Sequence, residues 1–282
     1  MHMETVTKAF VKKLFPRRPA WSHKGDFGKL LIIAGSRRYT GSPALCGLAA
    51  LRAGVDLVTI AAPQRAADTA ASFSPDLITE PLRGDCFNPW HLKTVLETAK
   101  GADAVVIGGG MGRRNETKHA VLNFLKNTNL PCVVDADAIH FLAERKEILP
   151  GKDFVLTPPP KEFFALAGEH PGTEPKKRAE LVKKHAKKLE AVILLKGHTD
   201  VISDGRKTML NKTGSPYLTK GGTGETVTGI CGALLARGVG SLEAACAAAY
   251  INGAAGELAS KQYGPGMLAS DLLGKIPEII KK

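Results

Sequence analysis

The chain has 282 residues, 44% of them hydrophobic and 23% charged, which is the composition of a folded globular protein rather than of a disordered or fibrous one. Its formal net charge of +12 favours an anionic partner, such as a nucleic acid, a membrane surface or a phosphorylated small molecule. No run of about 18 apolar residues is present, and residues 1–18 lack the apolar core of a signal peptide. We therefore expect a cytoplasmic protein with no membrane partner.

Short apolar runs alternate with helical patterns along the chain. In chain order we predict strand 30–34, helix 43–53, strand 55–62, strand 104–107, helix 118–126, strand 132–134, helix 138–145, strand 154–156, helix 161–167, helix 176–188, strand 192–195, strand 201–203, helix 226–237, helix 242–260 and a last helix after Pro265. This alternation predicts an α/β fold with a mainly parallel sheet and helices on both faces. No linker is visible, so we expect a single domain over residues 1–282, with residues 1–20 as an N-terminal extension or helix.

The predicted helix 176–188 carries much of the excess positive charge. Its apolar positions, Ala179, Val182, Ala186 and Leu189, recur at helical spacing and would leave the basic side chains on a solvated face. No recognition-helix motif or basic strand with interleaved aromatic residues accompanies it, so we do not expect nucleic acid as a partner.

The cysteines are odd in number and scattered, without metal-binding spacing, which indicates buried free thiols: Cys46, Cys86, Cys132, Cys231 and Cys246. We predict no metal-ligating residue.

Polar and glycine-containing segments follow five of the predicted strands at their carboxyl ends, where ligands of open parallel sheets bind. These segments are Gly35-Ser36, Gly108-Gly109-Gly110, Asp135-Ala136-Asp137, Thr157-Pro158 and Lys196-Gly197. Asp137 precedes a helix and would make an ordinary N-cap, and Asp135 could be a metal-associated carboxylate or the end of a strand. The segment from Gly108 to Gly112 is not a G-x-G-x-x-G fingerprint, so a tight turn explains it about as well as a binding loop.

The strongest chemical signal is the segment from Gly221 to Glu225, which opens an apolar helix. Consecutive glycines let backbone N–H groups approach an oxyanion, and the helix start adds a favourable partial positive charge. Gly222, Thr223 and Gly224 are the predicted anion hole, and Glu225 is the predicted general base. No G-x-x-x-x-G-K-[ST] motif occurs, so a Walker-type ATPase is excluded and this cluster is the best phosphate cradle.

Linked motifs give the chain a family resemblance. They are the segments 24–29, 35–36 with 39–42, 135–138, 156–158, 196–199, 211–216 and 221–224, which occur in order between about Lys24 and Gly256. Together they resemble the ADP/ATP-dependent NAD(P)H-hydrate dehydratase family. The resemblance implies a ribokinase-like fold and a metabolite-repair lyase, in which ADP or ATP with Mg²⁺ drives dehydration of hydrated NADH or NADPH. We also expect a homo-oligomer.

The resemblance assigns further residues. Nucleotide-binding positions would be Lys196, Gly197, His198, Thr199, Asp200 and Gly224. Substrate-binding positions would be Ser42, Gly112, Pro159 and Glu225. The family pattern has aspartate in place of Glu225, histidine in place of Pro159 and proline in place of Gly109. Two alternatives therefore stay open: a kinase of the same fold acting on a hydroxymethyl vitamin precursor, and a weakened protein that binds nucleotide without turnover.

Overall fold

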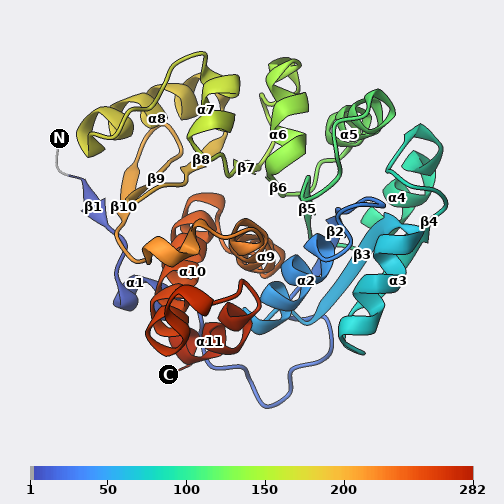
Figure 1. Ribbon diagram of the computed structural model, residues 1–282, viewed down its shortest axis with the longest axis horizontal. Coiled ribbons are helices and arrows are strands. Elements are labelled where there is room, and N and C mark those ends of the chain that lie inside the picture. The colour runs from blue at the N-terminus through green and yellow to red at the C-terminus, as the bar shows by residue number, and fades with distance from the viewer. Residues whose placement is uncertain (1–2, 282) are drawn as a thin grey trace.

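Ten strands form one sheet at the centre of the computed structural model, which describes residues 3–281 (Figure 1). Their order across the sheet is β1-β10-β9-β8-β7-β6-β5-β2-β3-β4. Strand β9 is antiparallel to both of its neighbours, and all the other pairs are parallel. The strands are β1 (Glu4–Thr5), β2 (Lys29–Ile33), β3 (Leu57–Pro63), β4 (Ile78–Leu82), β5 (Ala104–Ile107), β6 (Cys132–Val134), β7 (Phe154–Leu156), β8 (Val192–Leu195), β9 (Asp200–Ser203) and β10 (Thr208–Asn211).

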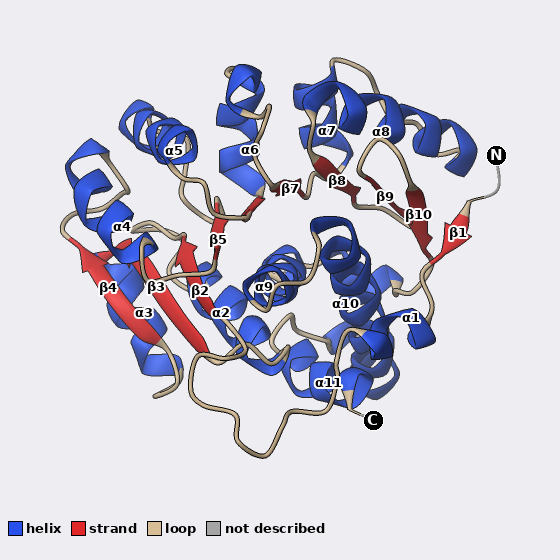
Figure 2. Cartoon of the chain, turned by 180° about the vertical axis from the view of Figure 1, so that it is seen from behind, coloured by secondary structure: helices blue, strands red, loops and turns tan. Residues whose placement is uncertain are grey.

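Helices cover both faces of this sheet, as Figure 2 shows from behind. One face is covered by α1 (Lys8–Lys13), α2 (Ser42–Arg52), α3 (Gln64–Phe73), α9 (Thr223–Ala236), α10 (Ser241–Tyr263) and α11 (Asp271–Ile280). The other face is covered by α4 (Leu92–Ala99), α5 (Asn115–Asn127), α6 (Ala136–Ala143), α7 (Pro160–Ala167) and α8 (Pro175–Leu189). The predicted mainly parallel α/β fold is therefore confirmed.

The strands are apolar at successive positions because helices cover both faces of the sheet. In β2, Leu30 and Ile32 point into the core under one helical layer, and Leu31 and Ile33 point into the core under the other. Because successive side chains of a strand alternate between faces, a strand buried on both faces must be apolar at every position.

Helices α2 and α9 lie unusually close together. A Cβ atom at Gly229 would lie only 2.1 Å from the carbonyl oxygen of Cys46. The absence of a side chain at Gly229 therefore allows the two backbones to approach, and this contact brings the N-terminal ends of both helices to the same edge of the sheet.

One boundary differs from the sequence-based expectation. Helix α9 begins at Thr223 rather than at residue 226, so Glu225 belongs to its first turn. The alanine-rich helix α10 packs inside the subunit, where thirteen of its residues are buried, including Ala248 and Ala255. All five cysteines are buried free thiols, as predicted. None of the helices within residues 3–281 combines the length and hydropathy that crossing a membrane requires.

Candidate active site

Five adjacent parallel strands, β8, β7, β6, β5 and β2, end at one edge of the sheet. The polar segments after these strands therefore lie side by side. The N-terminal end of α9 reaches the same edge and supplies Glu225. A surface hollow of about 1000 Å³ lies elsewhere, between α8 and the turn after β9, and its lining mixes lysines with acidic side chains. The candidate site is thus defined by converging side chains at the carboxyl edge.

The first turn of α9 presents backbone donors. Gly222 is its N-cap with a φ of +99°, a left-handed conformation that glycine adopts readily, and a Cβ there would lie 2.8 Å from Ala269 and Leu45. The first bond within the helix runs from the N–H of Thr226 to the carbonyl of Gly222. The N–H groups of Thr223, Gly224 and Glu225 thus have no acceptor within the helix, which makes this end suitable for an anion.

Ser42 holds the carboxylate of Glu225. Its Oγ donates to Glu225 Oε1 at 2.9 Å, and Ser42 itself is buried at the start of α2. A Cβ at Gly109 would lie 2.8 Å from Ser42 Oγ and 3.6 Å from Glu225 Cγ. A side chain at Gly109 would therefore displace this pair, so the glycine leaves the room that the longer glutamate side chain occupies.

Lys196 is the cation of the site. Its Nζ donates to Asp135 Oδ1 at 2.9 Å, and the same oxygen accepts a 2.6 Å bond from Thr157 Oγ1. Burial would lower the pKa of Lys196, but the nearby carboxylates of Asp135, Glu162 and Glu225 outweigh burial and raise that pKa. Lys196 therefore stays charged.

The two segments expected to bind nucleotide, residues 196–200 and the first turn of α9 with Gly224, meet at Lys196. A Cβ at Gly224 would lie 3.6 Å from Lys196 Nζ, so the ammonium group lies against the first turn of α9. An ammonium group and a row of unpaired N–H groups at one point attract a phosphate more strongly than either alone.

Glu162, in the first turn of α7, adds a carboxylate to the same neighbourhood. Its Oε2 is buried without a hydrogen-bond partner. Burial and the charge of Asp135 raise the pKa of Glu162 to about 7. Mg²⁺ is bound in proteins by one or two carboxylates together with waters and phosphates, and an unpartnered buried carboxylate oxygen fits that requirement. No group of three or more His, Cys, Asp or Glu side chains is placed to hold a metal without such help, as far as residues 3–281 are concerned.

Asp137 does not cap α6, contrary to the sequence-based expectation. Asp135 occupies the N-cap position, and Asp137 lies in the first turn. The carboxylate of Asp137 accepts the N–H of Gly112 at 2.8 Å and the Nε of Arg113 at 3.1 Å. The shift arises because Ala136 adopts a φ of +49°, which turns the chain sharply after β6. Gly112 is thus held through Asp137, on the loop after β5.

The turn between β8 and β9 contains the remaining predicted nucleotide residues. Asp200 Oδ1 accepts the N–H of Gly197 at 2.9 Å and closes the turn, while Asn211 donates to Asp200 Oδ2 at 3.0 Å. Burial raises the pKa of Asp200 to about 6. His198 is exposed and Thr199 is half-buried, so both lie at the surface of the turn.

Pro159 lies at the N-cap of α7, on the loop after β7. Its carbonyl accepts the N–H of Phe163, so its observed role is to start the helix that carries Glu162. This position is on the same sheet edge as Lys196, whose N–H donates to the carbonyl of the preceding Pro158.

Asn252 on α10 supports the site, although the sequence pattern does not predict it. Its side chain accepts a 2.6 Å bond from Thr226 Oγ1 and donates to the carbonyl of Thr223 at 3.4 Å. Asn252 thereby ties the first turn of α9 to α10. The only signal in the sequence was a single asparagine within a run of alanine and glycine.

Comparisons with known proteins identify the family of this chain. A family model described as NAD(P)H-hydrate dehydratase matches residues 30–278. The bifunctional NAD(P)H-hydrate repair enzyme of Pyrobaculum aerophilum is 42% identical over 270 residues, which are 95% of this chain and 53% of that protein. The ADP-dependent (S)-NAD(P)H-hydrate dehydratase of Cenarchaeum symbiosum is 38% identical over 272 residues, 96% of this chain and 94% of that protein. The chain thus spans about half the length of its bifunctional relatives.

A solved structure gives the same result for the fold. The ADP/ATP-dependent NAD(P)H-hydrate dehydratase of Bacillus subtilis, co-crystallised with ATP/Mg²⁺, superposes with a TM-score of 0.85 at 31% identity, covering 99% of this chain and 98% of that one. The expected ribokinase-like fold is confirmed by this match. With the family model covering most of its length, the chain belongs to the NAD(P)H-hydrate dehydratase family.

Proposed function

We propose that this protein dehydrates hydrated NADH and NADPH at the expense of ADP or ATP with Mg²⁺ and so regenerates the reduced nicotinamide nucleotide. The observation that carries the proposal is the pair formed by Ser42 and Glu225, 2.9 Å apart at the N-terminal end of α9, with the charged Lys196 beside the same turn. A general base, an anion-binding helix end and a cation at one point are the parts that phosphoryl transfer requires.

The chemistry follows from these parts. The C6 hydroxyl of the hydrated ring is a poor leaving group, and phosphorylation makes it a good one. Glu225 accepts the proton of this hydroxyl as its oxygen bonds to the terminal phosphorus of the nucleotide. The phosphoanhydride bond breaks at the same phosphorus, and its bridging oxygen leaves with the bonding electrons as AMP (from ADP) or ADP (from ATP). The N–H groups of Thr223 and Gly224 hold the transferring phosphoryl group. The phosphate then leaves C6 with the bonding electrons as the lone pair of the ring nitrogen forms an N=C6 double bond. Water accepts a C5 proton, the C5–H electrons form the C5=C6 double bond, and the dihydropyridine is restored.

Other residues position the reactants. Lys196 and the turn up to Asp200 would bind the nucleotide, and the loops that carry Ser42, Gly112 and Pro159 would bind the nicotinamide substrate. Glu162 and Asp135 would hold Mg²⁺ through its waters, and the ion would offset phosphate charge. The relatives that are named ADP-dependent, and the relative co-crystallised with ATP/Mg²⁺, support this choice of nucleotide and metal.

We further propose that residues 1–282 act as a single domain in the cytoplasm and that the protein is a homo-oligomer. One continuous sheet supports the first proposal, and five free cysteines suit a reducing compartment. The edge strand β4 supports an oligomer, because Ile78 on β4 is 49% exposed and Phe73, the last residue of α3, is 60% exposed.

The test is a product assay. The protein is incubated with enzymatically hydrated NADH and Mg²⁺, together with ADP, ATP or no nucleotide, and the absorbance of NADH is followed. We expect NADH to return only in the presence of a nucleotide. A stable phosphorylated product with no NADH would indicate a kinase, and nucleotide binding without any product would indicate a protein that has lost turnover.

A further inference from the structure

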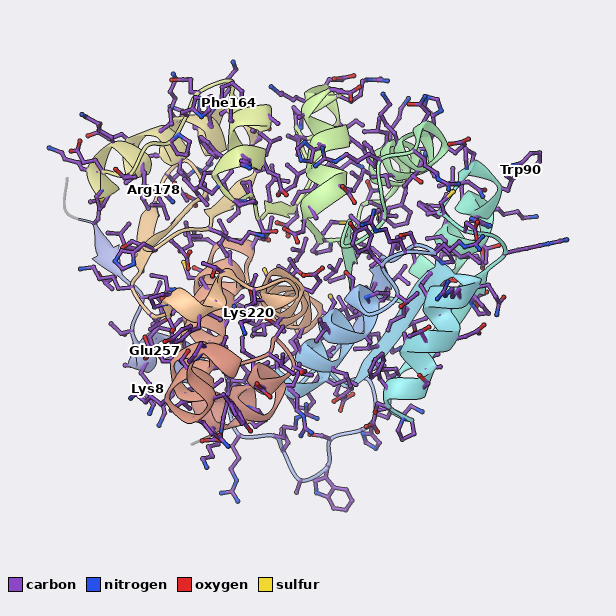
Figure 3. All side chains as sticks on the ribbon, in the orientation of Figure 1. Lys8, Trp90, Phe164, Arg178, Lys220 and Glu257 are labelled. Carbon is purple, nitrogen blue, oxygen red and sulfur yellow. The ribbon has the colours of Figure 1, made fainter. Side chains whose placement is uncertain are left out.

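The guanidinium of Arg178 is buried beneath the turn that joins β8 to β9. Arg178 lies in the first turns of α8, on the side that faces the sheet, and is only 6% exposed (Figure 3). The sequence pattern placed it on the solvated face with the neighbouring lysines, so its inward orientation was not foreseen. Long charged side chains are rarely buried unless their donors are satisfied.

The acceptors of this guanidinium are main-chain carbonyls on two different loops. One amino group donates to the carbonyl of Gly172, in the loop between α7 and α8, at 3.1 Å. The other donates to the carbonyl of Lys196, at the end of β8, at 3.3 Å. Arg178 therefore ties the loop before α8 to the residue that carries the cation of the candidate active site.

The fit at the turn is tight. A Cβ atom at Gly197 would lie 2.6 Å from the same amino group of Arg178, so the turn rests directly on the guanidinium. Burial lowers the pKa of Arg178, and the charge of Asp200 on the other side of the turn counteracts this effect. Asp200 in turn accepts the N–H of Gly197. The backbone from Lys196 to Asp200 is thus fixed from below by a cation and closed by an anion.

We propose that Arg178 is a positioning residue for the adenine nucleotide, because it holds the turn from Lys196 to Asp200 in the conformation that directs Lys196 at the phosphates. This inference rests on the proposed use of ADP or ATP. An apolar side chain could fill the same space at lower desolvation cost, but it would leave the carbonyl of Lys196 unfixed. The specific contribution of arginine here is to orient two carbonyls through its rigid fork of donors.

The test compares ADP affinity with thermal stability in the full chain. Arg178→Met keeps the length of the side chain and removes its donors, and Lys184→Met on the same helix is the matched control because Lys184 is exposed and pairs with Glu169 at the surface. Binding of ADP with Mg²⁺ is measured by isothermal titration calorimetry, well below the melting temperature of each variant. We expect Arg178→Met to weaken ADP binding by about tenfold or more and Lys184→Met to leave it unchanged.

A second variant approaches the same contact from the turn. Gly197→Ala places a methyl group against the guanidinium, so we expect it to weaken ADP binding in the wild-type background and to have little further effect beside Arg178→Met. Such non-additivity is the signature of two residues that act through one contact. If Arg178→Met does not fold, the effect of Gly197→Ala in the wild-type background and partial retention of ADP affinity in Arg178→Lys carry the test.

The outcomes distinguish a failure of the role of Arg178 from a failure of the proposed function. Equal ADP affinity of the wild type and Arg178→Met, or a lower melting temperature with unchanged affinity, would overturn the positioning role while leaving the proposed function intact. Unchanged ADP affinity in the Gly197→Ala single variant would also count against the positioning role of Arg178. If the wild type itself does not bind ADP, the proposed function fails, and the role of Arg178 fails with it.

Discussion

Shortening Glu225 to aspartate is the sharpest perturbation of the proposed mechanism. Glu225→Asp withdraws the carboxylate by on the order of 1 Å, a misplacement that costs roughly a hundredfold when it affects reacting groups. In the wild type, Ser42 Oγ donates to the carboxylate of Glu225 at 2.9 Å. The shorter side chain of aspartate no longer reaches Ser42 Oγ. A hydrogen bond to a charged group contributes about 1.5–3 kcal/mol, which corresponds to about 10–150-fold in rate when it is lost in the transition state. We therefore expect kcat to fall about a hundredfold.

The nucleotide site should be untouched by this change, because Lys196 and the first-turn N–H groups remain. The KM for ADP should accordingly stay within a few-fold of the wild type, which distinguishes a misplaced base from a damaged fold. The assay is steady-state regeneration of NADH from hydrated NADH. Glu225→Gln, which removes the base, should lose about 10²–10⁴-fold, and Ser42→Ala, which removes only the anchoring bond, should lose about tenfold.

The family pattern makes the opposite outcome informative. The resemblance implies aspartate at this position in the family, and Gly109 supplies the space that Glu225 uses here. A large gain in turnover for Glu225→Asp would show that glutamate is a handicap. That result would refute the view that Ser42 and Gly109 compensate for the longer side chain.

Three further predictions concern the metal, the packing and the electrostatics. Glu162→Gln should raise the magnesium concentration needed for half-maximal activity by at least about tenfold, as altered metal sites do, and an unchanged midpoint would remove Glu162 from the metal site. Gly229→Ala should lower the free energy of unfolding by about 3 kcal/mol or more through overpacking. Its control is Gly274→Ala, at an open and exposed helical position, which should raise the free energy of unfolding by about 0.5–1 kcal/mol. Both are measured by urea denaturation, and equal effects would contradict the close approach of α2 and α9. Burial raises the pKa of Asp200 from 3.8 to about 6, so the native state holds this proton more tightly and the free energy of unfolding should fall by about 3 kcal/mol as pH rises through that window. Urea denaturation from about pH 4 to about pH 7 should show that Asp200→Asn lacks this decline, and parallel curves for the two proteins would count against the shift.

Much of the fold could be predicted because its central strands are buried on both faces. Strands such as β5 and β8 are uninterrupted apolar runs, and the helices between them force a parallel arrangement. The edge strand β4 was not predicted, since it contains Glu80 and Pro81, residues that an edge tolerates and a central strand does not. The short strand β1 gave no pattern long enough to read.

The candidate site could be predicted only in part. Topology alone places the segments after five strands at one edge, and the glycine cluster with Glu225 indicates an anion site. The sequence pattern predicts a start for α9 at residue 226, three residues after its observed start, because consecutive glycines are typical of loops. Glycines can nevertheless belong to the first turn of a helix, where the backbone N–H groups have no acceptor within the helix. Which charged residue turns inward is decided by packing, so Arg178 could not be distinguished from the exposed lysines around it.

In the proposed mechanism, a nucleotide drives dehydration at Glu225. The most direct measurement is the yield of NADH from hydrated NADH with ADP, with ATP and without nucleotide, for the wild type and for Glu225→Gln. We predict NADH in proportion to the nucleotide consumed by the wild type, and a rate for Glu225→Gln at least about a hundredfold lower. NADH formation by Glu225→Gln at the wild-type rate would contradict the claim.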